Sequence, residues 1–301
     1  MLLLHDPRCA DYGSSMRPEQ PARVLTTAAH LRTAHPDWIW CNPSLTVPDK
    51  TLLLAHSAAH LNRLTQARDF DADTPFFPGI ADHARRAVAA ALEAAEHALT
   101  THEPSFSLMR PPGHHATADQ AMGFCYLNQV AIAALAAQRG FGNTGHGHPP
   151  AQRVAVWDFD AHHGNGTEAI LHDRTGLFYA SVHQYPGYPG TGTQDHGPNI
   201  RNWPVTPRTP RVDHMAALRA SLDAIVSFGP ELILVSAGFD AYADDPITSM
   251  TLEREDFGTL GRWLGETGRP AAALLEGGYS ADLPLLVDAF LSAWEKAHRI
   301  S

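Results

Sequence analysis

The sequence is short of lysine and carries no surplus of positive charge. Only two of its 22 basic residues are lysines, Lys50 and Lys296, the formal net charge is -10, and the arginines form no basic stripe. Binding to nucleic acid therefore has no electrostatic support. A negative surface could attract cationic substrates, although net charge alone is a weak indicator of that.

Paired cysteines and long hydrophobic runs are also missing. Cys9, Cys41 and Cys125 form neither a CxxC metal motif nor a disulfide framework, which is typical of proteins in the reducing cytoplasm. The apolar run in the opening MLLLHDP is too short for a signal peptide. No apolar run reaches the about 18 residues of a transmembrane helix. We therefore expect a cytoplasmic protein with no membrane partner.

Segments typical of strands alternate with segments typical of helices. Helices are predicted over 82–99, 123–139, 167–172, 212–228, 254–265 and 282–298, and strands over 106–109, 154–157, 178–183, 232–236 and 271–275. This alternation indicates a parallel sheet covered by helices on both faces. Segments 36–49, 140–150 and 187–211 are rich in Gly or Pro and should be irregular, with His146 and His148 solvated. Because no repeat or linker divides the chain, we expect one domain over 1–301.

Polar groups flanked by glycine follow five of the predicted strands. The segments are RPPGHHA, DFDAHHGNG, QYPGYPGTG, AGFDA and EGGYS. In open parallel sheets, functional groups gather in the loops at the carboxyl ends of strands. We therefore expect these five segments to form one site.

The segment RVAVWDFDAHHGN (153–165) places Asp158, Asp160 and His162 two residues apart at the end of an apolar strand. If the extended geometry continues, the three side chains point the same way, and an unpaired buried charge is costly unless a cation compensates it. Asp160, His162 and Asp240 offer the O, N, O donors of a catalytic divalent-metal site with open positions. A lone Asp more often caps a helix or loop, but a D-x-H pair plus another Asp after a second apolar strand favours a metal. Asp158 is interpreted as a supporting partner or as a ligand of a monovalent cation.

Two further groups adjoin glycine-rich turns. The tandem His114–His115 follows two prolines and a glycine in a rigid loop, although paired histidines are more often surface residues. Facing a metal site, they would act as general base and acid in hydrolysis. Tyr279 follows Gly277 and Gly278, which let the backbone approach a ligand closely. Its phenol could donate to a developing oxyanion.

Together these motifs resemble those of the zinc-dependent histone deacetylase family, which includes bacterial acetylpolyamine amidohydrolases and acetoin-utilisation proteins. The matching segments are RPPGHHA (110–116), GFCYLN (123–128), DFDAHHGNGT (158–167), SVHQYPGYPGTG (181–192), SAGFDA (236–241) and EGGY (276–279). RPEQPAR (17–23) resembles the amino-terminal HPExPxR of the family, with Arg17 in place of the usual His. WDFDAHHGNG and LEGGY are more similar to the class II and bacterial branch than to class I.

The resemblance implies a fold and cofactors. The fold would be the arginase–deacetylase three-layer α/β sandwich, with a mostly parallel central sheet and helices on both faces. Asp160, His162 and Asp240 would bind Zn²⁺, and their O, N, O donors also admit Fe²⁺. The ligands of a structural K⁺ would be the side chains of Asp158 and Ser181 and the carbonyls of Asp160, His162 and Val182.

The resemblance also implies catalytic roles. His114 and His115 would be the catalytic pair, with Asp158 orienting His114 and Asn165 supporting His115. Because a neutral Asn stabilises an imidazolium less than Asp does, His115 should be the better base near neutral pH. Tyr279 would polarise the acyl carbonyl.

The substrate would enter through a tunnel. Gly123, Phe124 and Tyr188 would line the tunnel around the alkyl chain of the amine, and Asp73, in DADTPFFPG, would grip the substrate at the rim. In the polyamine-selective class II members an acidic gatekeeper lies seven residues after the last metal Asp, and here Ile247 occupies that position. An isoleucine cannot pair with a second ammonium group. We therefore expect activity on acetyl-lysine-type or apolar acylated amines, with Asp244 and Asp245 able to compensate in part.

These observations favour a metal-dependent amidohydrolase that removes acetyl or other acyl groups from primary amines such as acetyl-lysine. One alternative is an acetylpolyamine amidohydrolase. A second is an arginase-type binuclear ureohydrolase, which is disfavoured because Gly164 stands where a second-metal Asp would be needed. A third is an inactive acyl-lysine binder, which is disfavoured because every residue that the chemistry needs is present.

Overall fold

The computed structural model describes residues 1–141 and 149–300, and its centre is one eight-stranded sheet. All neighbouring strands pair in parallel, in the order β2-β1-β3-β8-β7-β4-β5-β6. The strands are β1 (Leu2–Leu4), β2 (Ile39–Cys41), β3 (Ser105–Ser107), β4 (Val154–Asp158), β5 (Leu177–Gln184), β6 (Ile200–Val205), β7 (Leu232–Ala237) and β8 (Ala271–Leu275).

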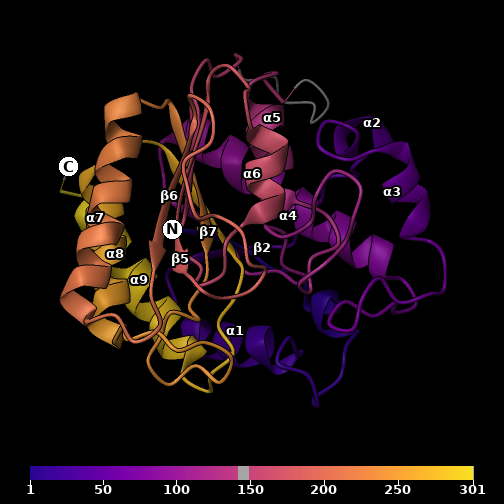
Figure 1. The fold of residues 1–301 in the computed structure, drawn as a ribbon, viewed down its shortest axis with the longest axis horizontal. Coiled ribbons are helices and arrows are strands. Elements are labelled where there is room, and N and C mark those ends of the chain that lie inside the picture. Colours follow the sequence, from indigo (N-terminus) through magenta and orange to yellow (C-terminus); the bar gives the residue numbers. More distant parts are fainter. Residues whose placement is uncertain (142–148, 301) are drawn as a thin grey trace.

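Helices cover both faces of this sheet (Figure 1). They are the 3₁₀ helix η1 (Pro7–Ala10) and α1 (Ala22–Ala34), α2 (Asp49–Leu52), α3 (Ala58–Arg63), α4 (Ile80–Thr101), α5 (Gln129–Ala137), α6 (Asn165–Leu171), α7 (Arg211–Phe228), α8 (Arg254–Glu266) and α9 (Leu283–His298). Helices α4 and α5 pack on one face, while α7, α8, α9 and α1 build the layer on the other. The predicted three-layer arrangement is confirmed, and the sheet in the described part of the chain is wholly rather than mostly parallel.

The helix layers pack on two apolar cores, one on each face of the sheet. Alternate residues along a strand belong to alternate cores. In β4, Ala155 and Trp157 belong to the core under α7, α8 and α9, whereas Val154 and Val156 belong to the core under α4 and α5. This alternation follows from the two-residue repeat of a strand, and it explains why β4 is apolar on both faces. Asp158, the last residue of β4, is the first polar group of this run and is fully buried.

The predicted elements after residue 150 lie within a few residues of the observed ones, but the amino-terminal part was poorly predicted. Strands β1 and β2 and helix α1 were not predicted, and β2 and β6 lie in segments expected to be irregular. β2 and β6 are the two edge strands of the sheet, so their residues need not form the continuous apolar run that marks a central strand. The strand predicted over 106–109 is Ser105–Ser107.

The helix predicted over 123–139 begins only at Gln129. Gly123 and Phe124 have positive φ angles of 56° and 67°, which a right-handed helix cannot accommodate. Asn128 caps the helix because its side chain accepts a hydrogen bond from the backbone N–H of Ala131 at 3.0 Å. The prediction was wrong for 123–128, and this loop carries two of the predicted tunnel residues.

Two sequence expectations concern solvent and membrane. His146 and His148, expected to be solvated, lie outside the described residues. Over 1–141 and 149–300, none of the helices is both long and apolar enough to span a bilayer.

Candidate active site

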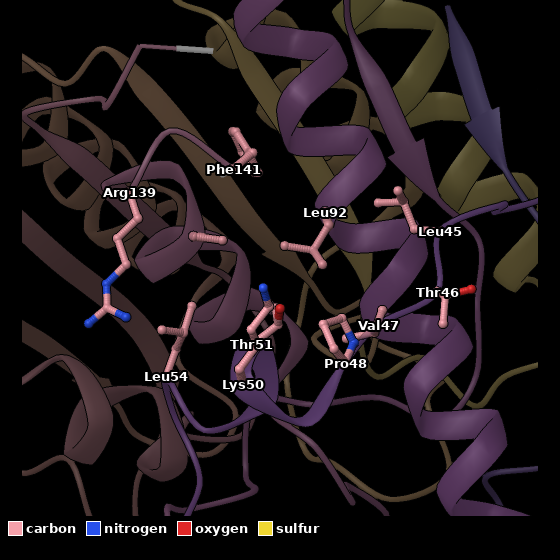
Figure 2. A pocket seen from close by; sticks show the side chains of 11 residues that line it. Leu45, Thr46, Val47, Pro48, Lys50, Thr51, Leu54, Leu92, Arg139 and Phe141 are labelled. Atoms are coloured by element: carbon pink, nitrogen blue, oxygen red, sulfur yellow. The ribbon is translucent and has the colours of Figure 1, made fainter. Parts of the chain in front are cut away.

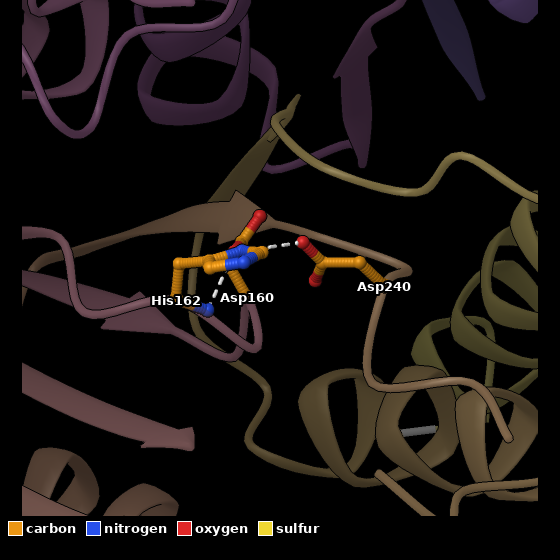
Figure 3. Close-up of side chains that lie close together, drawn as sticks. All are labelled: Asp160, His162 and Asp240. Atoms are coloured by element: carbon orange, nitrogen blue, oxygen red, sulfur yellow. Dashed lines mark hydrogen bonds and ion pairs between the residues drawn. The ribbon is translucent and has the colours of Figure 1, made fainter. Parts of the chain in front are cut away.

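The carboxyl ends of β4 and β7 bring the three predicted metal ligands together. The strands are neighbours, and Asp158 at the end of β4 pairs with Ser236 of β7. Asp160 and His162 follow β4, and Asp240 follows β7, so one donor atom from each lies within 4.8 Å of the others. His162 Nδ1 is 2.8 Å from Asp240 Oδ2 and 3.2 Å from Asp160 Oδ1 (Figure 3).

The reason for this convergence differs from the one expected. The extended geometry stops at Asp158, and the chain then turns. The backbone N–H of Asp160 donates to Asp158 Oδ1 at 3.2 Å, and that of His162 donates to Asp160 Oδ1 at 2.8 Å. The condition for aligning the three side chains by strand alternation, a continued extended geometry, is therefore not met. A hydrogen-bonded turn aims Asp160 and His162 instead.

The cluster fits a divalent cation. Asp160 and Asp240 are 1% and 0% exposed, and among the described residues no lysine or arginine forms an ion pair with either. Burial, followed by the nearby Asp160 carboxylate, raises the pKa of Asp240. The ion-pair partners of these two buried carboxylates in the described chain are the imidazoles of His114 and His162, and a bound cation would also compensate their charge. Their hard oxygens and the ring nitrogen match the donors of catalytic zinc or ferrous sites.

The tandem histidines lie beside this cluster, and each has its own hydrogen-bond partner. Their ring centroids are 4.0 Å apart. His114 Nδ1 is 3.1 Å from Asp158 Oδ2, and His115 Nδ1 is 2.9 Å from Asn165 Oδ1. The partners are the ones that the sequence predicted. Each partner fixes the orientation of its imidazole ring.

The surroundings push the two histidine pKa values apart. Burial alone would lower the pKa of His114, but the carboxylates of Asp160 and Asp158 outweigh it and raise the pKa to about 10. Burial, together with the charge on His114, holds the pKa of His115 well below its usual range. His115 is therefore the neutral member of the pair.

Two residues that support the histidines were missed in the sequence. Glu276 is fully buried and accepts hydrogen bonds from the backbone N–H groups of Gly113 at 2.7 Å and His114 at 3.2 Å. Tyr179 donates its hydroxyl hydrogen to Asp158 Oδ2 at 2.9 Å. Glu276 opens the EGGY motif, which was a usable signal. Tyr179 lies inside β5, where nothing in the local sequence distinguishes it from a core aromatic.

A cavity of about 270 Å³ opens onto His162 of the cluster and onto His115 of the tandem pair. All five residues predicted to bind substrate line it, together with three of the other site residues: Asp73, Gly123, Phe124, Tyr188 and Ile247, with His115, His162 and Tyr279. Arg17 and Pro18 also line it and were not predicted to do so. The replacement of the motif's usual His by Arg17 was the signal available.

Gly123 is needed in the cavity wall for two reasons. Its φ of 56° is in the left-handed region. A Cβ atom at this position would also stand 2.9 Å from Cγ of His115 and 3.0 Å from the ring of Tyr188. A larger residue would therefore displace either the histidine or the tunnel wall.

Tyr279 is held in the cavity wall from several sides. Its backbone N–H donates to Asp245 Oδ2 at 2.7 Å, and its ring lies 5.8 Å from that of Phe124. The Arg23 guanidinium is 4.7 Å from the centre of the Tyr279 ring. Burial raises the pKa of the phenol well above its usual value, so the hydroxyl remains a hydrogen-bond donor.

The residues predicted to bind potassium lie at the junction of β4 and β5. Asp158 pairs with Ser181 in the strand register, which places Val182 next along β5. Ser181 Oγ is 2.8 Å from His183 Nδ1. The structure thus places Asp158, Ser181 and Val182 side by side at this junction.

The position that an arginase-type site would need for its second metal is closed. A Cβ atom on Gly164 would collide with Asp158 Oδ2 and the Tyr179 hydroxyl. No carboxylate could therefore be placed there without displacing the partners of His114. A separate cavity of about 180 Å³ (Figure 2) contains none of the predicted site residues and is lined mainly by apolar side chains such as Leu45, Val47, Leu54, Leu92 and Phe141.

Comparison with known proteins identifies the family. A model of the histone deacetylase domain matches residues 17–293. The chain belongs to the histone deacetylase family. A probable deacetylase of Methanothermobacter thermautotrophicus is 34% identical over 296 residues, covering 94% of this chain and 86% of that protein. The acetylpolyamine amidohydrolase of Mycoplana ramosa is 37% identical over 217 residues, covering 69% of this chain and 61% of that protein.

A solved structure agrees with this placement in the family. The HD domain of HDA15 superimposes with a TM-score of 0.87 and 28% identity, covering 98% of this chain and 89% of that chain. The arginase–deacetylase fold predicted from the motifs is thus confirmed. The family relatives support a deacetylase, a hydrolase that acts on acylated amines.

Proposed function

We propose that the chain is a metal-dependent amidohydrolase that removes acetyl or other acyl groups from primary amines such as acetyl-lysine. The observation that carries this proposal is one cavity. It is lined by His115, His162 and Tyr279 and leads to the buried Asp160–His162–Asp240 cluster. Hydrolysis of an amide needs a base for water, a charge that polarises the carbonyl and a donor for the oxyanion. The cavity offers a group for each.

The side chains divide the proton transfers between them. His115, neutral and at the cavity wall, accepts the proton of the attacking water. His114, kept charged by Asp158 and Asp160, stabilises developing negative charge and can supply the proton for the leaving amine. Tyr279 donates to the oxyanion of the acyl group. Asn165 fixes the His115 ring without adding a charge.

The proposed metal is Zn²⁺, with Fe²⁺ as the alternative that the same donors admit, held by Asp160, His162 and Asp240. When bound there, the cation would polarise the acyl carbonyl and lower the pKa of the attacking water. A structural K⁺ is proposed at Asp158, Asp160, His162, Ser181 and Val182. We further propose that residues 1–301 form a single domain that works in the cytoplasm.

The proposed substrates are acetyl-lysine-type amines, because the mouth of the cavity carries Ile247 at the gatekeeper position. The sequence allowed Asp245 to compensate in part for the missing acidic gatekeeper, but the Asp245 carboxylate already has other partners. It is 6% exposed, and its two oxygens accept the backbone N–H groups of Tyr279 and Ile247 at 2.7 and 3.1 Å. The acetylpolyamine alternative is kept because a relative carries that name.

The test is metal analysis combined with acetate release. The purified protein, loaded with Zn²⁺ or Fe²⁺, should contain one tightly bound divalent ion per chain and release acetate from acetyl-lysine. Urea release from guanidino compounds with two metals per chain would favour the ureohydrolase. Tight binding of acetyl-lysine without acetate release at any metal loading would favour the inactive binder.

A further inference from the structure

Arg17 is a cation at the mouth of the proposed active site, and no carboxylate in the described part of the chain pairs with it. It lines the cavity together with Tyr279 and Ile247. Its guanidinium donates from Nη1 to the carbonyl of Ala72 at 3.2 Å, and within the described ranges it forms no ion pair. A single hydrogen bond to a carbonyl leaves most of its five donors available. In a chain of net charge -10, such a cation at a substrate entrance stands out.

A carboxylate adjoins Arg17 at the same mouth. Asp73 lines the cavity, is exposed and follows directly after Ala72, the residue to which Arg17 is bonded. Among the described residues, its carboxylate forms neither an ion pair nor a hydrogen bond. Asp71, in contrast, already accepts the backbone N–H groups of Asp73 and Thr74 at 3.0 and 2.6 Å. The mouth thus presents one available positive group and one available negative group close together.

We propose that this rim recognises the head of a free Nε-acylated α-amino acid such as Nε-acetyl-lysine. Arg17 binds the α-carboxylate, for which a guanidinium has matching forked geometry, and Asp73 binds the α-ammonium. The acylated side chain then extends past Tyr188 and Phe124 toward the cluster. This inference rests on the proposed deacetylase function and narrows its substrate to small zwitterionic amino acids rather than lysines within a protein.

The rim fits other acylated amines less well. The second cation of a polyamine could pair with Asp73, but it would leave Arg17 without an anion and would add a positive charge near Arg17 and the apolar Ile247. A lysine inside a protein has neither an α-carboxylate nor an α-ammonium, so it would offer Arg17 only neutral backbone carbonyls and Asp73 only backbone N–H groups. The competing role for Arg17 is structural, because its bond to Ala72 could simply hold the loop that carries Asp73.

The experiment compares kcat/KM for Nε-acetyl-L-lysine with that for its α-carboxamide, in the metal-loaded wild type and in Arg17→Gln. Glutamine can still donate to the Ala72 carbonyl, but it carries no charge. The ratio of the carboxylate to the carboxamide substrate should fall about fivefold in Arg17→Gln, as expected for a partly exposed charge pair. Arg17→Lys should recover part of the ratio, since it restores the charge but not the fork.

Arg68→Gln is the matched control. Arg68 is exposed, does not line the cavity and, within the described ranges, forms no ion pair, so it tests whether loss of any nearby positive charge is sufficient. The ratio should not move in this variant. An equal fall for both substrates in Arg17→Gln, or an equal fall in the ratio in Arg68→Gln, would overturn the inference.

The proposed deacetylase function and the proposed recognition by Arg17 can be tested separately. If the metal-loaded wild type hydrolyses neither compound, the deacetylase proposal is wrong. Calorimetric binding of Nε-acetyl-L-lysine and its carboxamide to wild type and Arg17→Gln then decides the recognition by Arg17. Tighter binding of the carboxylate form that is lost in Arg17→Gln supports the inference, and equal binding of both forms by both proteins refutes it.

Discussion

Glu19 and the pair Asp160 and Asp240 are buried carboxylates from different sequence motifs, and different partners compensate the cost of their burial. Glu19 receives hydrogen bonds from Arg110, through Nε to Oε1 and through Nη2 to Oε2 at 2.7 Å, and Arg23 Nη1 lies 3.3 Å from it. Burial raises the pKa of Glu19, but the two arginines outweigh this and leave it lowered. Asp160 and Asp240 are also buried, but over residues 1–141 and 149–300 their ion-pair partners are imidazoles and not arginines or lysines.

This difference distinguishes a group of charges that holds the structure together from a group that can bind a metal. The arginines around Glu19 also bind backbone carbonyls: Arg110 reaches Cys9 at 2.8 Å, and Arg23 reaches Gly278 at 2.7 Å. This group is complete, and it fastens the loop that carries Tyr279 to the amino-terminal segment. The Asp160–Asp240 group has imidazoles rather than guanidinium groups as its ion-pair partners, and an imidazole nitrogen, unlike a guanidinium, can itself ligate a divalent cation.

The largest expected effect comes from removing a carboxylate of the Asp160–Asp240 group. Asp240→Ala deletes a charged ligand, so the affinity for Zn²⁺ should fall by more than the roughly 100-fold typical of losing a hydrogen-bond partner of a ligand. Turnover should fall with it. Metal content after dialysis and acetate release measure both.

Asp244→Ala is the control for this variant, since Asp244 is exposed and lies four residues further along the chain. It should keep both metal and turnover. Full metal content and turnover in Asp240→Ala would show that the metal site is assigned to the wrong residues.

Removing an arginine from the group around Glu19 should instead lower the stability of the fold. Arg110→Met leaves Glu19 with a single arginine in a site where Arg110 is 0% exposed. Breaking a buried ion pair from one side typically costs about 3–5 kcal/mol in the free energy of unfolding. Urea denaturation measures this, and each folded chain should still bind one metal ion.

Arg262→Met is the matched surface control. Arg262 pairs with Glu266 at 2.9 Å, but both side chains are about half exposed (51% and 48%). The loss should remain below about 1 kcal/mol. Similar losses in the two variants would mean that the Glu19 group adds no more than a surface pair.

The same comparison shows what the sequence could predict. Asp160, His162 and Asp240 follow central strands whose apolar runs mark them clearly, so their convergence was predictable even though the turn after Asp158 was not. Glu19 and Arg110 are 91 residues apart, and no local pattern links them. The edge strands β2 and β6 were missed because β2 has only three residues in a proline-rich segment and the apolar residues of β6 are interrupted by polar ones and a proline. Helix α5 was predicted to begin too early because the positive φ angles of Gly123 and Phe124 leave no clear trace in composition.

Tyr279 joins the two groups, and its hydroxyl can be tested alone. In Tyr279→Phe the ring contacts with Arg23 and Phe124 remain, and only the proposed oxyanion donor is removed. Turnover should fall by roughly 10²–10³ with unchanged metal content and thermal stability. Tyr185→Phe, at a tyrosine that does not line the cavity, should leave turnover unaltered. Undiminished turnover in Tyr279→Phe would exclude this role.

The smallest expected effect comes from adding a carboxylate at the cavity mouth. Ile247 is 37% exposed and lines the entrance, so Ile247→Glu offers an anion to the second ammonium of a polyamine. Exposed charge pairs contribute up to about 1 kcal/mol, so the kcat/KM ratio of N8-acetylspermidine to acetyl-lysine should rise by about fivefold. Ile247→Gln has the same length without the charge and should leave the ratio near that of the wild type. A wild-type preference for the polyamine above roughly tenfold, about 1.4 kcal/mol, would contradict the acetyl-lysine-type assignment. So would equal ratios in Ile247→Glu and Ile247→Gln, because the charge at this position would then have no part in choosing the substrate.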